Sequence, residues 1–298
     1  MKILLTGGTG FLGRALLESF REEGSDVILC CRQPSQVMNM AAGASLCEVC
    51  GTAREDLVGV FRRHPDISAI VHAATDYGRA ASLPTAVFSG NLEFPVRLLE
   101  QAIAASVGLF INIDTFFNTN SINYQYLGEY ALSKRHFQEW GEFCGRRGKI
   151  SFVNLRMFHL YGPGDGEEKF VSAIIRDCLR DVTIDLTEGY QRRDFIFVED
   201  AAKAIVCALN AELGNSPGYV QYDIGSGASC AIREFVETIK RLSGSHSILN
   251  FGALPGRIGE FVDACADLRA IRAIGWLPAT SLEDGLRATI ANYRQSVL

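Results

Sequence analysis

A tyrosine and a lysine stand four residues apart in the run YALSK, as Tyr130 and Lys134. On a helix this spacing places both side chains on one face. A phenol can protonate the oxygen of a ketone that accepts a hydride, but its pKa of about 10 calls for electrostatic help. A neighbouring ammonium supplies that help because it favours the phenolate. The pair is therefore a candidate catalytic unit, although a helix-surface Tyr–Lys pair fits the pentapeptide alone equally well.

A third candidate catalytic residue, Thr115, ends the apolar run LFINIDT, which has the pattern of a buried strand. Ligands of a doubly wound sheet bind beyond the carboxyl ends of its strands. We therefore expect Thr115 to face the same crevice as the helix that carries Tyr130, and its short hydroxyl to orient a substrate carbonyl.

Apolar β-branched runs alternate with amphipathic helical patterns over the first two hundred residues. KILLT, DVILCC, ISAIVHAA, LFINIDT and ISFVNLRMF have the pattern of buried strands, and helical segments separate them. This order predicts an α/β fold, a doubly wound parallel Rossmann sheet with helices on both faces.

The pattern changes near residue 160, where Gly, Pro and short elements become frequent. We expect a dinucleotide-binding domain over residues 1–160, to which 194–212 returns. Residues 161–193 and 213–298 are expected to form a smaller mixed α/β region that binds the substrate. No low-complexity linker separates the two parts.

The run LLTGGTGFLG places three glycines between the first strand and the first helix. Gly7 allows a tight turn, Gly10 a close backbone approach to a pyrophosphate, and Gly13 close packing of helix on strand. The spacing GxxGxxG follows a strand and opens a helix, which is the context that makes such a pattern informative. The candidate cofactor-binding residues are Gly7, Thr9, Gly10, Phe11, Leu12, Arg32, Ala73, Ala74, Tyr130 and Lys134.

The end of the second strand favours NADP(H) over NAD(H). An acidic residue there binds the ribose 2′-hydroxyl of NAD, whereas an arginine accommodates a 2′-phosphate. The sequence has Cys30 and Cys31 at this point, no acidic residue, and then Arg32. If Arg32 is only solvated, NAD bound through the main chain is the alternative.

Several motifs together resemble the extended short-chain dehydrogenases/reductases, the group of nucleotide-sugar epimerases, dehydratases and reductases. They are TGGTGFLG, VHAAT, YALSK, LRMFHLYGPG, RRDFIFVEDAA and RIGE. Within this group, HAATDYG, NIDTFF, NYQYLGEYALSKRHF and YGPGDGEEKF resemble the CDP-abequose synthase family. That resemblance implies reduction of the 4-keto group of a CDP-linked 3,6-dideoxyhexulose with NADPH, in the biosynthesis of surface polysaccharide such as the O-antigen of lipopolysaccharide.

The resemblance also implies a set of substrate-binding residues. His159 matches a position that contacts the substrate diphosphate, commonly as Asn, and a structural histidine is the alternative. Arg193 and Arg257 match arginines that grip the diphosphate, and a guanidinium fork suits phosphate oxygens. Thr75 and Asp76 lie where the hexose is expected, although a plain loop role fits them as well. The full expected set is Thr75, Asp76, Thr115, His159, Phe170, Arg193 and Arg257.

Phe116 and Phe117 argue against dehydration. Sugar 4,6-dehydratases of the group carry an Asp–Glu pair after the threonine, and two phenyl rings cannot transfer those protons. Asp114 precedes Thr115 and is expected to face the other way. Reduction and epimerisation both fit Thr115, Tyr130 and Lys134, and Arg32 favours the reductase over an epimerase with tightly bound NAD. A non-catalytic NADP sensor is the third reading, and YALSK argues against it.

Composition narrows the class of protein further. The 298 residues are 48% hydrophobic and carry a formal net charge of −5, which does not suggest a nucleic-acid or membrane-surface protein. The nine cysteines include one CxxC spacing, at Cys47 and Cys50, with no second such pair to complete a four-cysteine site, and no metal site is expected. No run approaches a membrane span, so a cytoplasmic protein is expected. The resemblance implies a homodimer.

Overall fold

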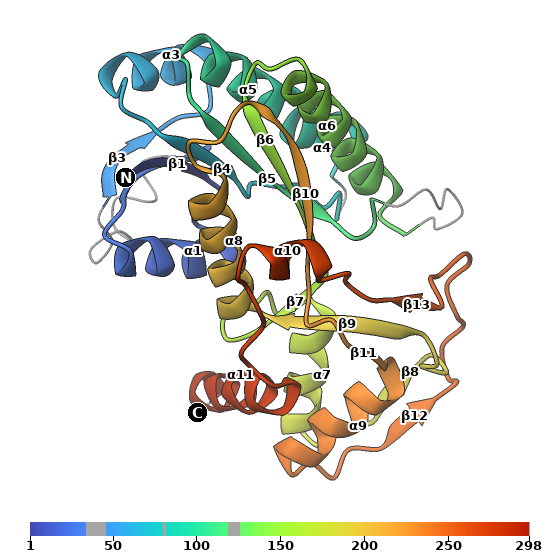
Figure 1. The fold of residues 1–298 in the computed structure, drawn as a ribbon. Helices are drawn as coiled ribbons and strands as arrows, with labels where there is room; N and C mark the ends of the chain where they lie inside the picture. The colour runs from blue at the N-terminus through green and yellow to red at the C-terminus, as the bar shows by residue number, and fades with distance from the viewer. Residues whose placement is uncertain (34–45, 80–81, 119–125, 298) are drawn as a thin grey trace.

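The computed structural model describes residues 1–33, 46–79, 82–118 and 126–297 (Figure 1). A large parallel sheet with helices on both faces forms the upper lobe in this view, and shorter strands and helices form the lower lobe. The described chain therefore confirms the doubly wound α/β fold with a smaller mixed region.

The large sheet has seven strands in the order β10-β6-β5-β4-β1-β2-β3, and every neighbouring pair is parallel. Because the strands are parallel, their carboxyl ends meet at one edge, where ligands of such sheets bind. The strands are β1 (Lys2–Thr6), β2 (Asp26–Cys30), β3 (Leu46–Cys50), β4 (Ala69–His72), β5 (Leu109–Thr115), β6 (Ser151–Met157) and β10 (Gly218–Ile224).

Helices cover both faces of this sheet (Figure 1). One face carries α1 (Phe11–Glu22), α8 (Val198–Glu212) and α10 (Arg269–Ala273). The other carries α3 (Arg54–Arg63), α5 (Phe94–Ala104) and α6 (Gly128–Arg146), with α4 (Pro84–Phe88) and the π-helical turn η1 (Ser89–Glu93) leading into α5.

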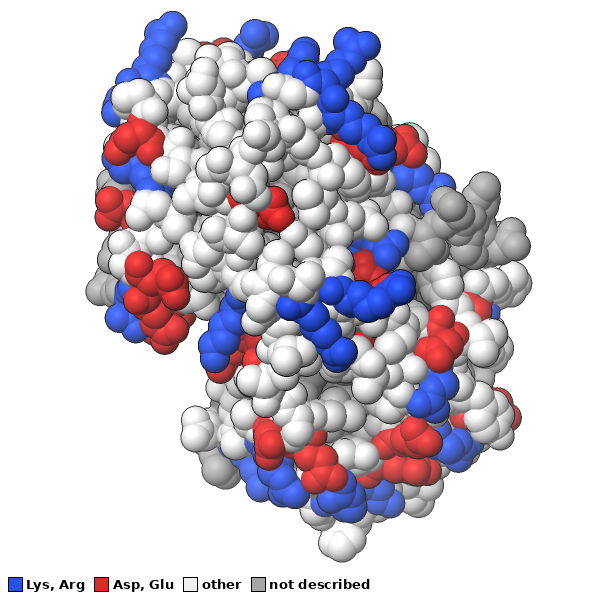
Figure 2. All heavy atoms as spheres, in the orientation of Figure 1, with Lys and Arg blue, Asp and Glu red and all other residues white. Residues whose placement is uncertain are grey.

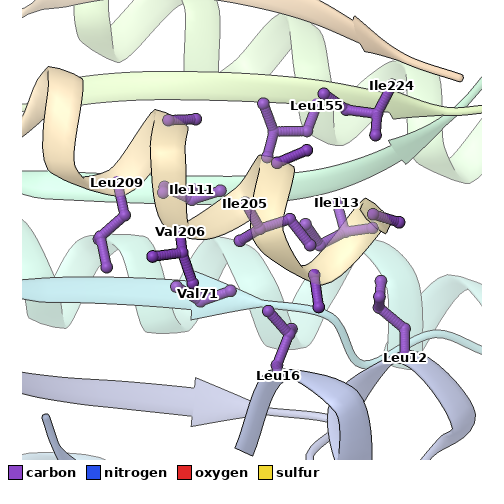
Figure 3. Close-up of a cluster of buried hydrophobic side chains, with 14 of the residues drawn as sticks. Leu12, Leu16, Val71, Ile111, Ile113, Leu155, Ile205, Val206, Leu209 and Ile224 are labelled. Atoms are coloured by element: carbon purple, nitrogen blue, oxygen red, sulfur yellow. The ribbon is translucent and has the colours of Figure 1, made fainter. Parts of the chain in front are cut away.

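The core between α1, α8 and the sheet is built from aliphatic side chains (Figure 3). Leu16 of α1, Ile205 of α8 and Ile111 of β5 belong to this cluster, and all three are fully buried. Burial of apolar surface of this kind is the main favourable term in folding. This packing holds α1, the helix that follows the glycine loop, against β1, the strand that precedes the loop.

The lower lobe holds two small sheets and three helices. β9 (Arg192–Phe197) is flanked by β11 (Ser229–Ala231) and β13 (Asp263–Ala264) and also pairs with β7 (His159–Tyr161). β8 (Ile184–Leu186) pairs with β12 (Leu249–Phe251). The helices α7 (Phe170–Leu179), α9 (Ile232–Ser243) and α11 (Leu282–Val297) pack on these strands around an aromatic core that includes Phe195 and Phe235.

The boundary between the two expected domains needs one adjustment at the sheet. β10 falls in the segment 213–298 that was assigned to the smaller region, but it pairs with β6 over its whole length in the large sheet. The reason is that α8 returns the chain to this sheet, and the next strand adds beside β6. The division of function between the two domains stays a prediction.

The described ranges contain no helix that is both long and apolar enough to cross a membrane. On the face shown in Figure 2, acidic and basic side chains are interspersed over both lobes. This face shows no extended area of a single sign.

Asp194 of β9 joins segments that are far apart in the chain. Its fully buried carboxylate accepts hydrogen bonds from the main-chain N–H groups of Ser226 at 2.7 Å and Gly227 at 2.9 Å, which follow β10. It also accepts one from the N–H of Ala266 at 3.1 Å, in the chain after β13. A buried carboxylate is stable only when it is paired in this way, so Asp194 fixes the lower lobe to the strand ends of the upper one.

We predict that Asp194→Ala lowers the free energy of unfolding by about 3 kcal/mol, because three main-chain donors lose their acceptor inside the protein. Urea denaturation followed by circular dichroism measures the change. Asp26→Ala, at an exposed position at the start of β2, is the matched control and is expected to change stability by less than about 0.5 kcal/mol. Equal stability losses in the two variants would contradict the assigned role.

Candidate active site

The glycine loop between β1 and α1 has no room for side chains. Gly7 has a φ of +73°, and a Cβ there would lie 2.5 Å from the main-chain nitrogen of Ala74. A Cβ on Gly13 would lie 2.0 Å from the carbonyl oxygen of Gly7. The loop therefore packs backbone against backbone at the end of β1 and beside the end of β4.

The first turn of α1 offers main-chain donors for an anion. Gly10 is the N-cap and supplies no capping side chain, and the first turn carries no acidic residue. The N–H groups of this turn and the positive end of the helix dipole are thus available to a pyrophosphate. Thr9 is exposed, Phe11 is half-buried, and Leu12 is buried in the core, so Leu12 can reach a ligand only through its N–H. The loop fits the dinucleotide expected from the sequence.

Ala73 and Ala74 lie against the loop, as expected. The N–H of Ala73 donates to the carbonyl oxygen of Thr6 at 3.2 Å, and the N–H of Ala74 donates to the Thr6 hydroxyl at 3.2 Å. The same hydroxyl is 2.8 Å from Nδ1 of His72. Burial lowers the pKa of His72 well below its usual value, so this histidine is neutral and has a structural role.

Thr115, Tyr130 and Lys134 come together at the end of β5. All three side chains are buried, with 5%, 6% and 3% exposure. The side chains of Thr115 and Tyr130 are hydrogen-bonded to each other, and Nζ of Lys134 donates to the carbonyl oxygen of Ile113 at 2.7 Å. Parallel strand geometry and the helical spacing thus bring the three expected catalytic residues to one point.

Burial dominates the acid–base properties of this cluster. It raises the pKa of Tyr130 well above its usual value, the nearby Tyr77 adds to this, and the hydrogen bond from Thr115 opposes it. Burial also lowers the pKa of Lys134 to about 8, although the negative charge of Asp114 acts in the opposite direction. The chain's own groups therefore hold Tyr130 as a protonated phenol and leave Lys134 close to its titration point at neutral pH.

Thr75 and Asp76 are engaged within their own loop. The Asp76 carboxylate accepts a hydrogen bond from the N–H of Gly78 at 2.9 Å. The main-chain N–H of Asp76 donates to Oδ1 of Asn91 at 2.7 Å. The Thr75 hydroxyl is 3.4 Å from the same Asn91 oxygen. The geometry thus supports the loop role for the Asp76 carboxylate, while the hexose contacts of both residues stay predictions.

Asn91 is a residue that the sequence did not indicate. Its amide nitrogen donates to the carbonyl oxygen of Asp76 at 2.7 Å and to the Ser133 hydroxyl at 3.0 Å, so it links the loop after β4 to α6. It lies in η1, where a π-helical turn redirects the side chain. No periodic signal in SGNLEF predicts such a turn.

Tyr77 and Lys169 border the same cluster. The ring of Tyr77 lies 5.1 Å from that of Tyr130, centroid to centroid. Nζ of Lys169 lies 5.5 Å from the Tyr77 ring and 5.3 Å from that of Phe11, and it pairs with Asp165 at 2.7 Å. Lys169 was not among the expected residues, and a lysine just before a helix is too common a pattern to have indicated it.

Aromatic rings form the wall beside Thr115. The Phe116 ring lies 4.5 Å from that of His159 and 6.1 Å from that of Phe261, and Phe117 lies 6.3 Å from Phe261. Burial lowers the pKa of His159 to about 3, and the charge of Arg193 adds to this, so the imidazole is neutral. Within the described part of the chain its buried Nδ1 has no hydrogen-bond partner.

The remaining expected substrate residues lie in the lower lobe and at its edge. Arg193 is buried and donates to Glu260 at 2.8 Å and to the carbonyl oxygen of Phe261 at 2.8 Å. The guanidinium of Arg257 lies over the ring of Tyr126 at 4.0 Å. Phe170 begins α7, is 42% exposed and stacks on Phe235. Their contacts with a substrate stay predictions.

Arg32 follows β2 and is exposed. Cys30 ends β2 and Cys31 separates the strand from Arg32, so no carboxylate occupies the position that would meet a ribose 2′-hydroxyl. The described ranges contain no group of three or more His, Cys, Asp or Glu side chains that could hold a metal ion.

Comparison with known proteins extends these observations. Residues 3–225 match the NAD dependent epimerase/dehydratase family. The chain is 34% identical over 289 residues to the CDP-abequose synthase of Salmonella typhimurium strain LT2, with 95% of each chain covered. Among solved structures it is similar to the UDP-glucose 4-epimerase of Thermotoga maritima with UDP-glucose, at a TM-score of 0.85 and 24% identity over all of both chains. It is also similar to MoeE5 in complex with UDP-glucuronic acid and NAD, at a TM-score of 0.83 and 25% identity over 99% of this chain and 100% of the other.

The Rossmann sheet, the glycine loop and the Thr–Tyr–Lys cluster define an oxidoreductase-type enzyme that depends on a pyridine nucleotide. The chain belongs to the NAD dependent epimerase/dehydratase family and is a nucleotide-sugar-modifying enzyme of its epimerase and reductase kind.

Proposed function

We propose that this enzyme reduces the C4 keto group of a CDP-linked 4-keto-3,6-dideoxyhexose, or of the corresponding 6-deoxyhexose, with NADPH. The observation that carries the proposal is the buried cluster of Thr115, Tyr130 and Lys134, next to two phenylalanines where a dehydratase has its acid and base. The similarity to a CDP-abequose synthase supports the substrate class and a place in deoxysugar biosynthesis.

In the proposed reaction a bound dihydronicotinamide supplies the hydride that reaches C4. The Thr115 hydroxyl orients the carbonyl oxygen, and the Tyr130 O–H bond breaks as its proton passes to that oxygen. The ammonium of Lys134 stabilises the resulting phenolate, which takes a proton from water before the next turnover. A buried phenol that its surroundings hold protonated suits the direction of reduction, because in that direction the phenol must carry the proton that the carbonyl oxygen takes up.

The aromatic wall supports a deoxy sugar as the substrate, in which the positions that face the rings carry no hydroxyl group. Phe116, Phe117 and Phe261 present apolar surface beside Thr115 and the neutral His159. A sugar hydroxyl turned towards such rings would lose its hydrogen bonds to water without replacement, at a cost of about 1–3 kcal/mol. A hydrogen or a methyl group in the same place has no such cost.

The absence of a carboxylate at the end of β2 and the presence of Arg32 support NADP(H) as the cofactor. MoeE5, a structural relative, binds NAD, and NAD(H) is the alternative for this chain.

We also propose that two chains pair through α6. This helix exposes Leu132, Trp140 and Phe143, whose exposed fractions are 52%, 48% and 50%. Trp140 follows Leu132 by eight residues and Phe143 follows Trp140 by three, and these spacings place the three side chains on one side of the helix. Large apolar side chains gathered on one face of this kind are typical of interfaces.

Replacing Tyr130 by Phe is expected to lower the rate of NADPH oxidation about 10²- to 10⁴-fold, because the proton donor is lost while the ring is kept. The measurement is absorbance of NADPH with a CDP-4-keto-3,6-dideoxyhexose. Tyr190→Phe, at a position 70% exposed in the lower lobe, is the control and should leave the rate unchanged. A wild-type enzyme that consumes no NADPH and releases NAD on denaturation would instead be an epimerase.

Replacing Arg32 by Ala is expected to weaken NADPH binding about tenfold or more and to leave NADH binding unchanged, because only NADPH carries the 2′-phosphate. Fluorescence titration of the two nucleotides measures the ratio. Arg54→Ala, at the exposed start of α3, controls for loss of one surface charge. Equal affinities of the wild type for NADH and NADPH would argue against the preference.

Replacing Trp140 by Glu is expected to shift the protein from dimer to monomer, because a carboxylate would be buried without a partner at the interface. Sedimentation velocity gives the mass. Val182→Glu, at an exposed apolar position of the lower lobe, should leave the dimer intact. A wild type that sediments at the mass of one chain rules the pairing out.

A further inference from the structure

The loop after β4 carries three polar side chains in succession, Thr75, Asp76 and Tyr77. The first two are engaged inside the protein. The Thr75 hydroxyl lies 3.4 Å from Oδ1 of the buried Asn91. The Asp76 carboxylate accepts a hydrogen bond from the N–H of Gly78 at 2.9 Å. Both groups therefore have partners of their own before a ligand binds.

The Tyr77 hydroxyl differs from these two groups. Within the part of the chain that the structure describes it has no hydrogen-bond partner, although the residue is half-buried. The hydroxyl of a tyrosine in such surroundings normally finds a partner. Its partner must therefore come from solvent or from a ligand, which makes it the polar side chain of this loop that is available for recognition.

Tyr77 stands beside the candidate catalytic Tyr130. The centroids of the two rings are 5.1 Å apart, and the ring planes are inclined by 35°. The phenols are close enough for Tyr77 to contribute to the raised pKa of Tyr130, which is also hydrogen-bonded to Thr115. A sugar whose carbonyl lies at Thr115 and Tyr130 is therefore within reach of Tyr77.

Two cations help to fix the Tyr77 ring. Cζ of Arg79 lies 5.3 Å from the ring centroid, and Nζ of Lys169 lies 5.5 Å from it. Both distances are within the range of cation–π attraction. Lys169 is in turn paired with the buried Asp165 at 2.7 Å. A ring that is held in place before a ligand binds loses little conformational entropy on binding.

The strand order places this phenol and the aromatic wall on different sides of Thr115. Tyr77 follows β4, Thr115 ends β5, and His159 follows β6, which is the neighbour of β5 on the side away from β4. The Phe116 ring meets His159 on that second side, at 4.5 Å between ring centroids. A sugar bound at Thr115 thus has apolar rings towards β6 and an unpartnered hydroxyl towards β4.

The proposed substrate has one hydroxyl for such a group. In a CDP-linked 4-keto-3,6-dideoxyhexose, C1 carries the diphosphate, C4 the keto group and C5 the ring oxygen, while C3 and C6 carry no hydroxyl. C2 therefore bears the single free hydroxyl of the sugar. Because one ring carbon separates C2 from C4, the groups that bind the oxygens at C2 and C4 must be neighbours, as Tyr77 and Tyr130 are.

We propose that Tyr77 is a specificity-determining residue of the substrate site: its hydroxyl forms a hydrogen bond with the C2 hydroxyl of the sugar, next to the carbonyl oxygen held by Thr115 and Tyr130. The identity of the substrate rests on the proposed ketoreductase function. The contact itself requires only a nucleotide hexose with its C4 at Tyr130. The aromatic wall then excludes hydroxyls from one side of the sugar, and Tyr77 recognises the hydroxyl that remains on the other.

The test is a cycle of two enzymes and two substrates, followed by NADPH oxidation. Wild type and Tyr77→Phe are each assayed with CDP-4-keto-3,6-dideoxyhexose and with its analogue that lacks the C2 hydroxyl. With the complete substrate, kcat/KM should fall about 3- to 15-fold in the variant, because one hydrogen bond between neutral groups is lost. With the analogue the two enzymes should agree within about twofold, because neither can form that bond.

Thr75→Val is the matched control. It removes a hydroxyl from the same loop that is already close to Asn91, so the ratio of kcat/KM between the two substrates should stay at its wild-type value. An equal fall of kcat/KM with both substrates in Tyr77→Phe, or no fall with either, overturns the proposal. An equal fall accompanied by a raised KM for NADPH would assign the Tyr77 hydroxyl to the cofactor instead.

Two further arms keep the test decisive. If Tyr77→Phe does not fold, Tyr77→Met, which fills similar space without a hydroxyl, takes its place. A wild type that oxidises no NADPH rejects the ketoreductase function, and the contact is then tested by calorimetric titration of CDP-glucose and CDP-2-deoxyglucose. A loss of affinity in the variant that is confined to CDP-glucose supports the contact, and an equal loss with both ligands overturns it, as does no loss with either.

Discussion

The bond from the Lys134 ammonium to the carbonyl oxygen of Ile113, at 2.7 Å, is the contact on which the site depends. It fixes α6 at the carboxyl end of β5 and so brings Tyr130 beside Thr115. The two residues are fifteen positions apart in the sequence. The third turn of the same helix packs Phe137 against Phe110 and Phe152 of the sheet. Apolar packing in the middle of α6 and polar contacts nearer its N-terminus thus hold the helix on the sheet. The candidate catalytic residues of the helix lie in its N-terminal part.

The position of this bond reflects a change of composition along the strands. On the face beneath α5 and α6, the row of Leu4, Ile70, Phe110 and Phe152 is apolar, but the next row of side chains in register on this face is polar. They are Thr6, His72, Asn112, Asn154 and Gln221. Polar groups in a buried layer need partners, and several form a chain of contacts such as Asn112 to Asn154 at 2.7 Å. The same low-dielectric layer explains why burial dominates the pKa shifts of His72, Tyr130 and Lys134.

The lower lobe completes the site from the other side of the strand ends. Asp194 fastens it to the chain after β10, while the neighbouring Arg193 is tied to Glu260 and the carbonyl oxygen of Phe261. The same short segment therefore carries a ring of the aromatic wall and a partner of the arginine expected to hold a diphosphate.

The sequence alone determined the order of strands and helices in the upper lobe, the glycine loop and the Tyr130–Lys134 spacing, because each depends on local periodicity or on a backbone geometry that only glycine allows. Only the tertiary structure decided that β10 adds to the large sheet, that Asn91 links the loop after β4 to α6, and that the Asp76 carboxylate is used within its own loop. It alone also buried Lys134, and that burial lowers the pKa of the lysine to about 8. These properties arise from burial and from contacts between segments distant in the chain, and no local pattern of residue types encodes them.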